Sequence, residues 1–136
     1  MDVAQTRVLH RGALVFLAGF AVHNLDHVRR GLDGVDEPVV WGGTLVAIVS
    51  AIVLTLVFTQ HRLAPFAAVA AGFPIAIGVA ATHLLPEWGS LSDPLPSGGV
   101  DAGTWIAVLA EVAGAVVLGL AGLSVVRHLR FQVPAA

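Results

Sequence analysis

The sequence contains no cysteine. Disulfides, thiolate metal sites, iron–sulfur clusters and thiol nucleophiles are therefore excluded. Any metal that this chain binds must use nitrogen or oxygen ligands, which histidine, aspartate and glutamate supply.

Charge is also scarce. Charged residues make up 12% of the 136 residues and hydrophobic residues 57%, whereas a typical soluble domain is about 25% charged. This composition indicates a multi-pass protein of the cell membrane, with the lipid bilayer as its partner. Lysine is absent and the seven arginines are scattered in ones and twos, so no basic patch suggests a nucleic-acid partner.

Four hydrophobic segments follow one another along the chain. A bilayer core of about 30 Å requires about 20 helical residues, and the segments at about 8–30, 39–59, 63–85 and 102–126 meet this length. The first segment resembles a signal peptide but lacks a small-residue cleavage site, so we expect it to be retained. The sequence predicts an all-α fold, in which residues 1–136 form a single integral membrane domain, a bundle of four transmembrane helices.

The arginines predict the orientation of this bundle. One side of the four spans would carry five of them, Arg7, Arg11, Arg62, Arg127 and Arg130, and the other side only Arg29 and Arg30. The positive-inside rule then places both termini in the cytoplasm and the connections 31–38 and 86–101 outside. The three tryptophans lie near the predicted outer boundary, as in an interfacial aromatic belt: Trp41, Trp88 and Trp105.

The first span contains ionisable residues. Its purely apolar part, 12–22, would form only about 16 Å of helix, so the helix must continue through the pentad His23-Asn24-Leu25-Asp26-His27. Ionisable groups inside a membrane are costly and usually face the protein interior. The pentad is therefore a candidate functional site.

Two further ionisable residues occur at a similar depth, His83 in the third span and Glu111 in the fourth. His23 and His27 are four residues apart and share one helix face, a geometry that suits a single metal ion. We therefore predict that His23, His27, His83 and Glu111 bind a divalent transition metal. Zinc and iron both suit these ligand types.

A metal bound in this way could activate water, which would make the protein a metal-dependent membrane hydrolase. Asp26 and Glu111 are the candidate catalytic proton acceptors, and Asp26 could instead orient an imidazole. The loop 86–101 could cover the site and add Asp93 or Asp101 as a ligand.

Other interpretations stay open at this point. The same residues could form a structural polar network between the helices, a pathway for protons or ions, or the two axial ligands of haem b. The chain would then be a non-enzymatic subunit, alone, as a homo-oligomer or in a larger membrane complex.

Small residues recur at spacings near four in the last two spans. Such stripes let membrane helices approach closely, which predicts tight packing through Ala67, Ala71, Gly72, Gly78 and Ala81 of the third span and Ala110, Gly114, Ala115, Gly119 and Gly122 of the fourth.

Overall fold

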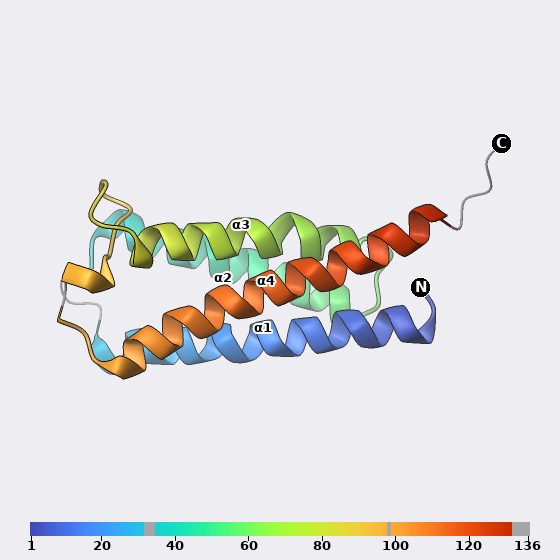
Figure 1. The fold of residues 1–136 in the computed structure, drawn as a ribbon, viewed down its shortest axis with the longest axis horizontal. Coiled ribbons are helices and arrows are strands. Elements are labelled where there is room, and N and C mark those ends of the chain that lie inside the picture. Colours follow the sequence, from blue (N-terminus) through green and yellow to red (C-terminus); the bar gives the residue numbers. More distant parts are fainter. Residues whose placement is uncertain (32–34, 98, 132–136) are drawn as a thin grey trace.

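The computed structural model describes residues 1–31, 35–97 and 99–131. Within these ranges the fold is all-helical, with α1 (Val3–Arg30), α2 (Glu37–Phe58), α3 (Ala64–Leu84), a short 3₁₀ turn η1 (Leu95–Ser97) and α4 (Ala102–Phe131). The four α-helices lie side by side along one axis (Figure 1). The start of α1 and the end of α4 lie at one end of the bundle, and the start of α2 and the end of α3 lie at the other, which we call the loop end.

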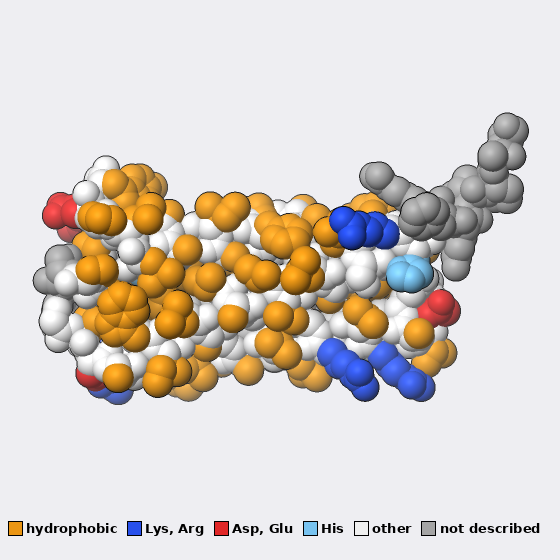
Figure 2. Space-filling model, in the orientation of Figure 1, with side chains coloured by type: hydrophobic (Ala, Val, Ile, Leu, Met, Phe, Trp, Pro, Cys, Tyr) orange, Lys and Arg blue, Asp and Glu red, His pale blue; other side chains and the backbone are white. Residues whose placement is uncertain are grey.

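Each of the four α-helices is long and apolar enough to cross a membrane. Apolar side chains cover the face of the bundle between its ends, and charged side chains gather at the two ends (Figure 2). The predicted all-α fold with four candidate spans is confirmed. Which end faces the cytoplasm stays a prediction.

Two helices are longer than the sequence predicted. α1 begins at Val3 rather than near residue 8, because Asp2 caps its first turn. The Asp2 carboxylate accepts from the Gln5 backbone N–H at 2.8 Å, and the Gln5 side chain accepts from the Asp2 N–H at 3.1 Å. This reciprocal pair is a capping box. α4 continues past its predicted end near residue 126 to Phe131.

α4 lies between α1 and α3 and packs against both along much of its length (Figure 1). Glycine makes this close approach possible, as the stripes of small residues predicted. A Cβ at Gly72 would lie 2.7 Å from the carbonyl oxygen of Ala115, and a Cβ at Gly122 would lie 2.6 Å from that of Pro65. By contrast, α2 packs mainly on α3 and touches α1 at few points. The bundle is therefore tight around α4 and looser between α1 and α2.

Candidate metal centre

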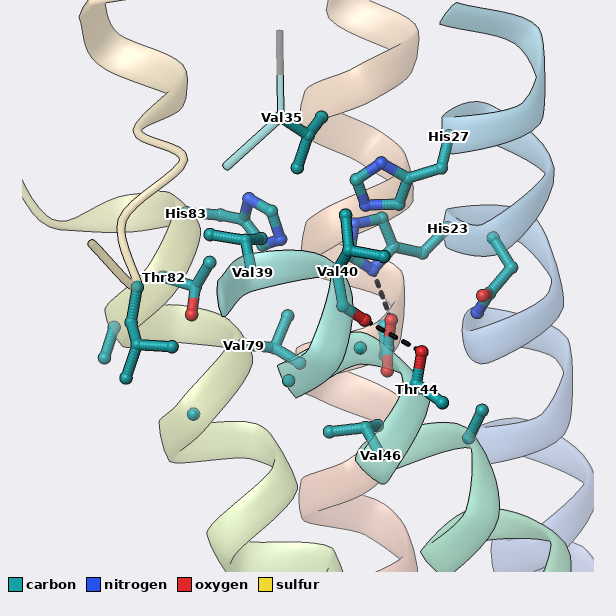
Figure 3. A pocket seen from close by; sticks show the side chains of 18 of the residues that line it. His23, His27, Val35, Val39, Val40, Thr44, Val46, Val79, Thr82 and His83 are labelled. Atoms are coloured by element: carbon teal, nitrogen blue, oxygen red, sulfur yellow. Dashed lines mark hydrogen bonds and ion pairs between the residues drawn. The ribbon is translucent and has the colours of Figure 1, made fainter. Parts of the chain in front are cut away.

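Three histidines meet near the loop end of the bundle. His23 and His27 stand one turn apart on α1, and His83 occupies the last turn of α3. One ring nitrogen from each of the three lies within 4.8 Å of the other two, and the imidazoles face one another (Figure 3). The structure thus brings together three of the four predicted metal ligands, from two helices that are far apart in sequence.

The three rings are in direct contact. Their centroids are 4.7 Å apart for His23 and His27, 5.0 Å for His23 and His83, and 5.8 Å for His27 and His83. His23 and His83 are only 5% and 4% exposed, and His27 is half-buried. A buried imidazole has lost its hydrating water, so its ring nitrogens need hydrogen-bond partners or a bound metal instead. A ring nitrogen that has no such partner is therefore a candidate metal ligand.

Glu111 holds His23 from the other side. The Glu111 carboxylate, from the first third of α4, pairs with Nδ1 of His23, and Glu111 is only 2% exposed. If the carboxylate is ionised and the ring is neutral, Nδ1 of His23 donates and the lone pair of the ring lies on Nε2. That Nε2 is buried without a hydrogen-bond partner. Glu111, the predicted fourth ligand, therefore pairs with Nδ1 of His23. It lies outside the group of mutually close ligand atoms, which contains only the three histidines.

The loop after α3 fixes His83 in a similar way. The backbone carbonyl of Asp93 accepts a hydrogen bond from Nδ1 of His83 at 3.0 Å, which leaves the Nε2 lone pair of His83 free. A carboxylate oxygen of Asp93 lies 3.5 Å from the same nitrogen. The loop is anchored there, because the Asp93 N–H donates to the Thr82 carbonyl at 2.9 Å. Asp93 thus joins the site through its backbone, beside His83.

His27 is held less firmly than the other two. Arg30 approaches its Nδ1 at 3.5 Å, a distance at the limit for a hydrogen bond. The ring can therefore turn to accommodate a bound group more easily than His23 or His83.

Asp26 has different neighbours. Its carboxylate accepts from Arg29 Nη2 at 2.7 Å and from Arg30 Nε at 3.0 Å. Arg29 also bonds the Thr104 hydroxyl at 3.3 Å and pairs with Asp101 at 2.9 Å. Asp26 and Asp101 therefore belong to a second cluster, which joins the end of α1 to the start of α4 and which we call the α1–α4 clamp. Asp26 is thus paired with two arginines, and it is not among the grouped metal-ligand atoms.

A cavity of about 530 Å³ adjoins the histidines, between α1, α2 and α3. All three histidines and Glu111 line one part of it, and apolar residues line most of the rest, among them Phe20, Val39, Val46 and Val79. Hydropathy and residue spacing along the chain did not predict this cavity or the contribution of α2 to it. The one available signal was the pair Gly42-Gly43, which removes two adjacent side chains from an otherwise bulky span.

The fold and site together define a class: a four-helix apolar bundle of membrane-spanning length with a histidine cluster that could bind metal. No known protein family, characterised protein or solved structure matches this chain. Conclusions about its function therefore depend on the chemistry of the site.

Proposed function

We propose that this chain is a membrane metalloprotein in which His23, His27 and His83 bind one divalent transition metal. The observation that carries the proposal is the buried Nε2 of His23, which has no hydrogen-bond partner. The other two histidines of the cluster lie beside the His23 ring. A buried nitrogen lone pair without a partner is costly. A bound metal cation would satisfy it and its neighbours at once.

The partners of the ring nitrogens support a metal over a purely structural network. Nδ1 of His83 donates to a backbone carbonyl, and Nδ1 of His23 pairs with a carboxylate. A neutral ring that donates from Nδ1 keeps the lone pair of its Nε2 for another partner. A histidine whose second nitrogen is fixed by a carboxylate or a carbonyl is the usual arrangement around a metal ion.

The spacing of the rings supports a single ion over haem. Zn–N bonds of about 2.0 to 2.1 Å at tetrahedral angles place ligand nitrogens about 3.4 Å apart, so nitrogens within 4.8 Å of one another need to close by at most about 1.4 Å. A haem would need a flat slot between two opposed imidazoles, whereas these three rings contact one another.

The proposed reaction is metal-dependent hydrolysis. Catalytic zinc sites commonly use three protein ligands and leave a fourth position for water, and a metal bound there would supply a Lewis acid that activates water near neutral pH. The cavity beside the histidines has room for a substrate. We propose that Glu111 positions His23. Asp26 is paired with two arginines, and we propose that it stabilises the packing of α1 on α4.

Metal content tests the proposal. The full chain, purified in mild detergent without chelators and reloaded with zinc or ferrous iron, is expected to hold about one metal per chain by elemental analysis. His27→Ala and His83→Ala should both lose it, because each removes a ligand. His128→Ala is the matched control, since this histidine is exposed at the opposite end of the bundle.

A metal content well below one per chain in the wild type would refute the metal centre. So would an equal metal content in His83→Ala and His128→Ala. A visible spectrum with a haem band that His83→Ala removes would establish the haem alternative instead. Hydrolysis is tested on the same samples with a chromogenic ester of a medium-chain acid. Turnover should follow metal content across the variants, and turnover that survives metal removal would exclude this reaction.

A further inference from the structure

The cavity beside the histidines has a shape that its glycines create. A Cβ built at Gly42, Gly43 or Gly78 would meet nothing within 4 Å, and all three residues line the cavity. This differs from Gly19, Gly72, Gly114 and Gly122, where a Cβ would collide with a neighbouring helix. Gly78 was predicted to be part of a packing stripe, and that interpretation is wrong because Gly78 borders open space.

Glycine in the middle of a helix costs about 0.5 to 1 kcal/mol relative to alanine. At Gly72 or Gly122 this cost is offset by closer helix packing. At Gly42, Gly43 and Gly78 no packing contact offsets it in the bundle itself. What these three glycines provide is volume next to the histidines.

Part of the rim of the cavity lies on the apolar spans. Asn24 of α1, Thr44 of α2 and Gly78 of α3 line the cavity and are exposed, and α1 and α2 touch at few points. The rim continues at the loop end, where Trp88 and Leu91 line the cavity and are exposed. A bilayer around the spans would face the first part of the rim, so a molecule could enter the cavity from the membrane.

The walls differ in chemistry from one part of the cavity to another. The three histidines face one another on one side (Figure 3), with the unpartnered Nε2 of His23 buried there. Valine and alanine side chains and the glycine residues of α2 and α3 form much of the remainder. This division matches a molecule with a polar head and an apolar tail, and the volume is within the range of about 300 to 1,000 Å³ of small-molecule sites.

We propose that the cavity binds a single-chain amphiphile from the bilayer, with its anionic oxygen head group toward the histidines and its apolar chain against Gly42, Gly43 and Gly78. The position of the head group depends on the proposed metal, because three neutral imidazoles around a divalent cation leave a net positive charge that attracts an anion. The binding of the chain depends only on the cavity.

Trp88 offers a local reporter, since it lines the cavity, whereas Trp41 lies outside it. Two forms of the full-length protein are needed in mild detergent. One keeps Trp88 alone (Trp41→Phe, Trp105→Phe), and the other keeps Trp41 alone (Trp88→Phe, Trp105→Phe). The probe is a fatty acid with bromine at its middle carbons, which quenches tryptophan on contact.

We expect saturable quenching of Trp88 at low probe concentration and only gradual, non-saturable quenching of Trp41. Gly78→Leu should remove the saturable phase because the leucine occupies the cavity, while the metal content stays at one per chain. Ala70→Leu is the matched control, since Ala70 is exposed on the same helix and lies outside the cavity. It should leave the saturable phase intact.

The outcomes separate this inference from the proposed function. If the protein holds metal but Trp88 shows no saturable quenching, the lipid site is overturned and the metal centre stands. The same follows if Gly78→Leu leaves the saturable quenching of Trp88 unchanged. Saturable binding in a chain that holds no metal would support the lipid site and refute the metal centre. If both are correct, removing the metal with a chelator should weaken binding of the fatty acid more than binding of the uncharged alcohol with the same brominated chain.

Discussion

At the scale of single residues, His23 is the centre of the site. One of its nitrogens is paired with Glu111 and the other is buried without a partner. The pair forms because Gly19, one turn before His23, lets α1 lie directly against the backbone of Ala110, the residue before Glu111. Any larger residue at position 19 would push the two helices apart and separate the carboxylate from the imidazole.

Glu111→Gln should weaken metal binding without abolishing it. The substitution keeps the shape of the side chain but removes the carboxylate that pairs with Nδ1 of His23, and loss of such a partner typically reduces metal affinity about 10- to 100-fold. The measurement is competition for zinc against a chelator of known affinity. If Glu111 were itself a metal ligand, the loss should match that of His83→Ala, and an unchanged affinity would exclude a positioning role.

At the scale of whole elements, the α1–α4 clamp joins the two longest helices at the loop end. Asp26 is buried at 7% exposure and binds Arg29 and Arg30, and Arg29 continues the cluster to Thr104 and Asp101. The Thr104 backbone N–H and the Arg29 side chain lower the pKa of Asp101 below its ordinary value. A lowered carboxyl pKa adds stability above the unfolded value and loses it as pH falls through the folded one. The clamp is therefore intact at neutral pH.

Asp26→Asn should destabilise the protein while leaving its metal content at one per chain. The substitution removes the charge that both arginines bind, and hydrogen bonds to charged groups contribute about 1.5 to 3 kcal/mol each. Thermal unfolding in detergent, followed by circular dichroism, should show a lower Tm than the wild type, and elemental analysis should show unchanged metal. A variant that keeps its Tm but loses metal or hydrolysis would place Asp26 in the catalytic site, as the sequence alone suggested.

At the scale of the whole molecule, a bound metal would link α1 directly to α3. These helices otherwise meet mainly through α4, which packs against both. A ligand that binds only the folded state stabilises it by about 2.7 kcal/mol at a concentration of 100 times Kd. The metal should therefore act as a cross-link at the loop end.

Saturating zinc should accordingly raise the Tm of the wild type, and a chelator should reverse the change. His83→Ala should show no such response because it removes the only ligand from α3. His128→Ala, at the opposite end, should respond like the wild type. A zinc-dependent increase that persists in His83→Ala would show that the ion stabilises the bundle from some other place.

Much of the fold could be predicted from the sequence because membrane length and polarity impose strong limits. A 12% charged chain with four long apolar segments has few alternatives to a helical bundle. The shortness of the apolar stretch before His23 was enough to place the pentad inside a helix. Ionisable groups are costly in lipid and usually face the protein interior, which predicted that His23, His27 and His83 lie together. The structure brings these three histidines together. The ends of α1 and α4 were less accurate, because capping by residues such as Asp2 extends a helix beyond its hydrophobic part.

The sequence by itself thus determined the helices, their apolar surface and the positions of the three histidines along them, because each depends on spacing along one chain. Only the tertiary structure decided which atoms meet. It placed Glu111 against Nδ1 of His23, turned Asp26 to the arginines, brought the Asp93 carbonyl to His83 and left Gly78 facing a cavity. Those outcomes depend on how helices rotate and approach one another, and a residue's position along its own helix does not fix what a neighbouring helix presents to it.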